Sequence, residues 1–184
     1  SRWYMATVCL ASLFAITRYP ELGAAQTDFF LKYLLSSQSA IMWMSALFPA
    51  ATVVYGVALF TGNDFAGRVA SKLTWVAAGA GLIGLLVRWH ETHLYEGGIG
   101  YIPVSNLYEV FVLFAVMTAL IYLYYENAQR TRSMGFFVLL IISASIGFLL
   151  WYHFDRGAYQ IEPLVPALNS YWMKIHVPTN FVGY

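Results

Sequence analysis

The sequence predicts an all-α protein, a multi-pass transmembrane helix bundle with five full spans and the start of a sixth. Two observations of composition predict this fold class. Of the 184 residues, 60% are hydrophobic and only 10% are charged, whereas a soluble domain carries about 25% charged residues. The mean hydropathy is +0.62. A chain so poor in charge cannot cover a water-exposed surface with polar groups, so most of its outer surface is expected to face lipid.

The third observation is a series of apolar segments that approach the length of a membrane span, about 20 residues as a helix. Residues 40–61 contain no charge and carry Pro49, which membrane helices tolerate. The first apolar run, residues 3–17, is interpreted as a span rather than a signal peptide, because no A-x-A-like cleavage site follows it. The remaining predicted spans are residues 73–89, 107–125 and 135–152, and a sixth apolar stretch begins near Tyr171.

Two further features of the apolar segments predict contacts. The span 73–89 carries small side chains, which let another membrane helix approach closely; they are Ala77, Ala78, Gly79, Ala80, Gly81 and Gly84. Between the first two spans, the string DFFLKYLLSS in residues 18–39 is expected to lie flat on the membrane surface. We expect one transmembrane domain over residues 1–184, and we interpret it as the N-terminal part of a longer protein, because its last apolar stretch stops in mid-span.

Loop charges predict the orientation of the chain. Two short predicted loops, residues 62–72 and 126–134, fall on one side because successive helices alternate in direction. Their Lys and Arg side chains favour the cytoplasmic side. The longer segments on the opposite, extracytoplasmic side carry all 4 histidines of the chain, which are His90, His93, His153 and His176.

Charge and cysteine content exclude several functions. The net charge of +1 argues against a nucleic acid partner, whose phosphates call for a basic patch. Cys9 is the 1 cysteine, and the chain has neither a CxxC metal clip nor a CxxCH haem-attachment motif, so it is not itself a c-type cytochrome. The string RWHETH does not match HExxH, which excludes a zinc protease of that type.

The string GYIPVSNLYE predicts the start of the fourth span. Pro103 favours an extended entry, Asn106 is a good N-cap, and Glu109 three residues later completes a capping box. These residues can therefore be explained by the physics of helix initiation alone.

The histidines leave two interpretations open. His90 and His93 lie on one face if their helix continues past Trp89, and they are either metal ligands or solvated interfacial side chains. His153 ends the fifth span, where a cation is favourable. His176 differs because apolar and aromatic residues surround it, and an imidazole there needs a partner. It is a candidate axial ligand of haem iron, with Arg156 and Lys174 as candidate partners of the propionates, although both can also be ordinary juxtamembrane charges.

Three strings together resemble the CcsA/ResC family of cytochrome c biogenesis proteins, called CcsB in some bacteria. They are RW followed by a loop and GYIPVSNLYEVF, a helix ending in GFLLWY, and LVPALNSYWMKIHVPTNFVGY. The resemblance covers about residues 85–184. In the third and most specific string, His176 corresponds to one of the family's two external haem-ligating histidines, and the match around it includes Pro166, Ala167, Leu168, Ser170, Trp172 and Val177. Many family members have His where this chain has Tyr101.

The resemblance implies system II haem handling in a bacterial inner (plasma) membrane. Haem b is then a transported substrate, and His176 is its predicted binding residue and iron ligand. The implied partners are a ResB-like (CcsB-type) membrane protein, apocytochrome c, thiol-reducing thioredoxin-like proteins and the lipid bilayer. Holocytochrome c synthase (haem lyase) activity is expected only of the full-length protein with its partner, and the catalytic residues are unknown. The family's tryptophan-rich segment, second external histidine and membrane histidine are expected after Tyr184.

Two other classes of function compete with this one. The first is a non-catalytic scaffold or anchor subunit of a respiratory or photosynthetic complex. The second is a transporter, which the shortage of mid-span charges other than Glu109 argues against. For the haem-handling function, we expect His176 at the extracytoplasmic end of its helix, exposed to a groove.

Overall fold

The structure is a computed structural model that describes residues 2–20, 24–95, 102–103, 106–156, 176 and 179–180. Within these residues the chain forms helices and no strand. In chain order the elements are α1 (Arg2–Thr17), α2 (Ala24–Thr27), the π-helical segment η1 (Leu31–Leu35), α3 (Ser37–Thr61), α4 (Asp64–Tyr95), α5 (Leu107–Gln129) and α6 (Gly135–Arg156).

Four helices, α3 to α6, are long and apolar enough to cross a membrane, which confirms the predicted all-α membrane bundle. The first predicted span forms α1, whose 16 residues extend about 24 Å. That length is less than the hydrocarbon thickness of about 30 Å. The predicted sixth stretch lies outside the described residues except for His176, Thr179 and Asn180, which are helical.

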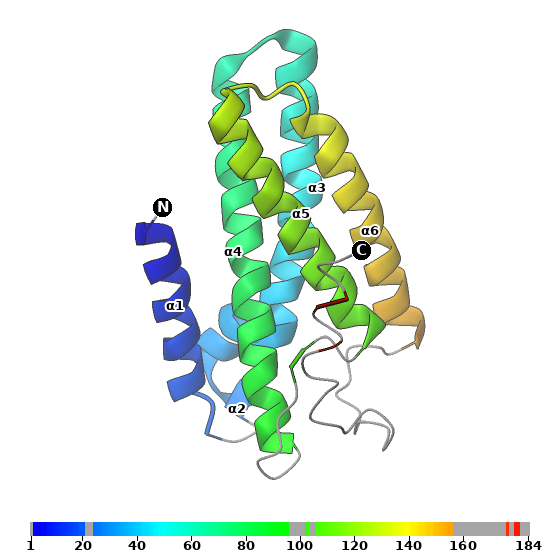
Figure 1. The fold of residues 1–184 in the computed structure, drawn as a ribbon. Coiled ribbons are helices and arrows are strands. Elements are labelled where there is room, and N and C mark those ends of the chain that lie inside the picture. The colour runs from blue at the N-terminus through cyan, green and yellow to red at the C-terminus, as the bar shows by residue number, and fades with distance from the viewer. Residues whose placement is uncertain are drawn as a thin grey trace.

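Helices α3, α4, α5 and α6 run side by side, and α1 lies against the outside of α4 (Figure 1). The Tyr4 hydroxyl of α1 donates a hydrogen bond to the Trp75 carbonyl at 2.9 Å, and the two rings meet edge to face. The α3–α4 and α5–α6 connections share one end of the bundle, which we call the loop end. At the other end α3 and α5 begin and α4 and α6 finish; we call it the histidine end, because His90, His93 and His153 lie there.

Close packing of α3 on α4 confirms the expectation drawn from the small residues of α4. A Cβ atom added at Gly84 would lie 2.8 Å from Ile41 Cγ1 and 3.4 Å from the Ser37 carbonyl oxygen. One added at Gly81 would lie 2.7 Å from Met44 Sδ and would also overlap Val116 of α5. These two positions therefore let α3 and α5 approach the backbone of α4.

The predicted loop over residues 62–72 is wrong, because α4 already begins at Asp64. Gly62 closes α3 in the left-handed conformation with φ 63°, and the Asn63 side chain accepts the Phe65 N–H at 2.9 Å. Two residues thus suffice for the turn. Arg68 lies in the early turns of α4, where the long stem of a cation reaches the membrane surface from within a helix.

Two other helices also extend beyond the ends of the predicted spans. The third span continues past Trp89 to Tyr95, and the fourth continues to Gln129. Arg130, with φ 52°, ends α5 in the left-handed conformation that commonly closes helices. Polar residues at the ends of these membrane helices are thus helical rather than part of the loops.

Replacing Gly84 with Ala tests the packing of α3 on α4. The added methyl group has to push Ile41 and the Ser37 backbone of α3 away from α4. We therefore expect the free energy of unfolding to fall by about 1–3 kcal/mol. The matched control is Gly147→Ala in α6, where nothing lies within 4 Å of the new atom and helix propensity improves. Thermal unfolding in detergent micelles, followed by circular dichroism, compares the two. Equal melting temperatures would contradict the close approach.

Candidate functional site

A buried ion pair joins α4 to α5 near the histidine end. Arg88 Nε donates to Glu109 Oε1 at 2.6 Å, and both side chains are only 2% exposed. Removing either partner would leave an uncompensated charge inside the bundle, which is strongly unfavourable. The pair therefore constrains which faces of the two helices meet.

Glu109 also builds the start of α5. Its Oε2 accepts the Asn106 N–H at 3.3 Å, while Asn106 Oδ1 accepts the Tyr108 N–H at 3.3 Å. This reciprocal pattern confirms the predicted capping box. One carboxylate thus uses its first oxygen for Arg88 and its second for the helix terminus.

The sequence pattern did not predict a role for Arg88, which precedes Trp89 in the string RW. The signal was present, because Arg88 and Glu109 are opposite charges within two predicted spans. Ionisable residues inside membrane helices usually face the bundle interior and pair with one another.

Tyr108 extends this contact to α6. The Arg88 guanidinium carbon lies 5.5 Å from the centre of the Tyr108 ring, in a cation–π arrangement. The Tyr108 ring also lies beside His153, with ring centres 5.8 Å apart. His153 lies near the end of α6 as expected, but its burial, at 9% exposed, was not predicted. Side chains of α4, α5 and α6 therefore form one connected cluster.

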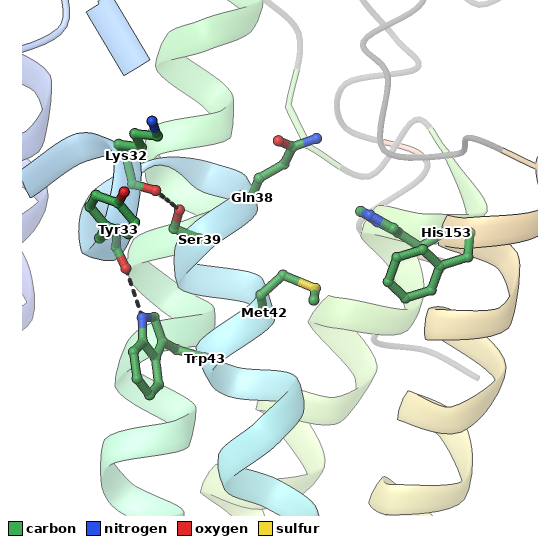
Figure 2. A pocket seen from close by; sticks show the side chains of 8 residues that line it. Lys32, Tyr33, Gln38, Ser39, Met42, Trp43 and His153 are labelled. Atoms are coloured by element: carbon green, nitrogen blue, oxygen red, sulfur yellow. Dashed lines mark hydrogen bonds between the residues drawn. The ribbon is translucent and has the colours of Figure 1, made fainter. Parts of the chain in front are cut away.

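A pocket of about 730 Å³ opens beside His153, between η1, α3 and α6 (Figure 2). Its walls are Lys32 and Tyr33 of η1, Gln38, Ser39, Met42 and Trp43 of α3, and His153 and Phe154 of α6. In Figure 2, Gln38 and Met42 point toward His153 across the pocket. The pocket thus combines an imidazole, an amide, a thioether and aromatic rings.

Two hydrogen bonds hold η1 against α3 at this pocket. Trp43 Nε1 donates to the Tyr33 carbonyl at 2.8 Å, and Ser39 Oγ donates to the Lys32 carbonyl at 2.5 Å. Both acceptors are backbone groups of η1, so these two bonds do not use the polar ends of the Lys32 and Tyr33 side chains.

Glu91 fastens the start of α3 to the end of α4. Ser37 Oγ donates to Glu91 Oε2 at 2.5 Å. Tyr19, which follows α1, also lies near this carboxylate. Burial raises the pKa of the Tyr19 hydroxyl, and the charge of Glu91 and a hydrogen bond to it raise that pKa further.

One ring nitrogen of His90 and one of His93 each lie near a backbone carbonyl oxygen. His90 Nε2 lies 3.2 Å from the Tyr19 carbonyl oxygen, and His93 Nδ1 lies 2.9 Å from that of Trp89. Across the part of the chain that the structure describes, no three His, Cys, Asp or Glu residues are grouped as metal ligands.

His176 is helical and its side chain is exposed. Its neighbours in the family-like string, from Pro166 to Trp172, lie outside the described residues, as does Tyr101. Its position in a groove and its role as a haem ligand therefore remain predictions.

A second polar cluster lies toward the loop end, around the buried carboxylate of Glu126. The Tyr55 hydroxyl donates to Glu126 Oε2 at 2.5 Å, and Arg132 Nε donates to Glu126 Oε1 at 3.1 Å. This cluster joins α3, α5 and the α5–α6 connection. It is the counterpart, at the opposite end, of the pair formed by Arg88 and Glu109.

The sequence is similar to known proteins of cytochrome c biogenesis. A family model described as "Cytochrome C assembly protein" matches residues 104–184. The cytochrome c biogenesis protein CcsA of Cyanophora paradoxa is 37% identical over 104 residues, which cover 54% of this chain and 29% of that protein. For CcsA of Pyropia yezoensis the identity is 30% over 138 residues, 73% of this chain and 40% of that protein.

A longer match is to CcsA of Synechococcus sp. (strain JA-2-3B'a(2-13)), which is 26% identical over 177 residues, 94% of this chain and 45% of that protein. The chain thus spans less than half the length of these curated relatives. No solved structure matches it significantly.

Replacing Asn106 with Ala tests the capping box. The first turn of α5 loses its side-chain acceptor, so we expect the free energy of unfolding to fall by about 1 kcal/mol. Asn106→Ser keeps a capping oxygen and should lose much less. Chemical unfolding of both variants in micelles measures the difference, and an equal loss in the two would contradict the role of the cap.

Proposed function

Because this chain belongs to the CcsA family of cytochrome c biogenesis proteins, we propose that it handles haem. In this proposal the full protein delivers haem b to the outer face of the membrane and helps to attach it to the CxxCH motif of apocytochrome c. The chain supplies apolar helices that anchor this activity in the membrane.

The observation that carries the proposal is the family match over residues 104–184. That region contains both the start of α5, with its capping box, and His176. Exposure of the His176 side chain supports a role in contacting a ligand from outside the bundle. A neutral imidazole there would supply an axial ligand to the haem iron before the haem is attached to the apocytochrome.

The proposed attachment needs reduced cysteines. Each CxxCH thiol adds across one haem vinyl group, so that sulfur bonds to one vinyl carbon and hydrogen ends on the other. No group leaves, and thioredoxin-like proteins would keep the thiols reduced beforehand. A ResB-like membrane partner would complete the haem site.

We propose that the histidine end faces the extracytoplasmic side. Four cations at or near the loop end support this orientation, because Lys and Arg favour the cytoplasmic side; they are Arg68, Lys72, Arg130 and Arg132. If the protein is bacterial, the proposed location is the inner (plasma) membrane.

The test is the haem content of the full protein, purified with its partner from membranes. His176→Ala should lose most of its Soret absorbance per protein, and added imidazole should restore part of it by filling the vacant axial position. The matched control is His93→Ala, because His93 is also exposed and lies at the histidine end; its haem content should not change.

Two outcomes would contradict the proposal. Unchanged haem content and an unchanged spectrum in His176→Ala would remove His176 as a ligand. A wild-type protein that purifies without haem and does not support cytochrome c maturation would favour the scaffold function instead.

A further inference from the structure

We propose that the pocket between η1, α3 and α6 binds the headgroup of an anionic membrane phospholipid. Lys32, at the η1 side of the pocket, would neutralise the phosphate, and an acyl chain would follow the apolar part of the lining. This site is separate from His176 and does not depend on the proposed haem chemistry.

The depth of the pocket matches the headgroup layer. The 25 residues of α3 extend about 37 Å, which is longer than the hydrocarbon core of about 30 Å. Both ends of α3 therefore reach the interfacial layers. Gln38 and Ser39 lie in the first turn of α3, and His153 and Phe154 lie in the last turn of α6.

The charge of the pocket favours an anion. Lys32 is the cation among the 8 described residues of the lining, and no carboxylate is among them. No described residue forms an ion pair with Lys32, whose ammonium lies 5.5 Å from the centre of its neighbour's ring, Tyr33. The nearby cation Arg18 differs, because Asp28 accepts its hydrogen bond at 3.4 Å. Lys32 is thus available to a phosphate from outside the chain.

The apolar part of the lining favours a lipid over a soluble anion. Trp43 is 49% exposed and Phe154 is 73% exposed, with the thioether of Met42 between α3 and α6. Aromatic side chains of this kind are typical of the membrane interface. A free phosphate would leave this apolar surface uncovered, whereas an acyl chain would cover it.

The segment before α3 supports the same occupant. Phe29, Phe30 and Tyr33 are exposed and contact one another through their rings. This cluster is the apolar patch that the sequence predicts to lie on the membrane surface. It places Lys32 where an apolar surface segment meets a membrane span, as in interfacial anchors whose cations attract anionic lipids.

The experiment counts the lipids bound to the purified full protein by native mass spectrometry. The probes are dioleoylphosphatidylglycerol, dioleoylphosphatidylcholine and inorganic phosphate. We expect tighter binding of phosphatidylglycerol than of phosphatidylcholine, and little competition from phosphate. Lys32→Gln should weaken phosphatidylglycerol binding about fivefold, since one basic residue near an anionic surface contributes about 1 kcal/mol.

Two variants provide controls. Lys32→Arg keeps the charge and should keep the affinity. Lys72→Gln removes an exposed cation from the early turns of α4, at the other end of the bundle, and should leave the affinity unchanged.

Equal phosphatidylglycerol affinity in the wild type and Lys32→Gln would overturn the proposal, as would equal binding of the two lipids. Full displacement of lipid by phosphate or by haemin would also overturn it, by assigning the pocket to another ligand. Haem content should stay unchanged in Lys32→Gln, so failure of this proposal can be distinguished from failure of the haem function.

Discussion

The buried ion pair between Arg88 and Glu109 is the interaction on which the histidine end depends. Both charges are buried in the bundle, and each is stabilised there by the opposite charge 2.6 Å away. Net stabilisation from such a pair is small when it is compared with well-packed apolar side chains. Its main effect is specificity, since any other alignment of α4 and α5 would leave two buried charges without partners.

Three residues of the string NLYE make contacts that shape the histidine end. Asn106 caps α5, Tyr108 lies between Arg88 and His153, and Glu109 joins the cap to the ion pair. One short string thus connects the start of α5 to α4 on one side and to α6 on the other. His153 is also a wall of the pocket, so the shape of the proposed lipid site depends on the same contacts.

Composition and local pattern predicted much of the fold. Charge depletion predicted a membrane bundle, and the spacing of Asn106 and Glu109 predicted the capping box, because these features depend on residues close together in the chain. The small residues of α4 likewise predicted close helix packing.

The site was less predictable because it depends on which helix faces meet. Arg88 and Glu109 are 21 residues apart, and neither the pair nor the burial of His153 follows from local spacing. The loop over residues 62–72 was predicted from its charges, yet Arg68 and Lys72 are helical. Long cationic side chains can reach the membrane surface from a helix, so charge alone does not mark its end.

A double-mutant cycle on the free energy of unfolding tests the central claim most directly. The variants are Arg88→Met, Glu109→Gln and both together; Gln at position 109 keeps an oxygen for the Asn106 N–H, so the cap is preserved. We expect each single variant to lose about 3–5 kcal/mol, and the double variant to lose clearly less than the sum, because no unpaired charge is left behind. Losses that simply add would contradict the account, since they would show that the two side chains do not interact.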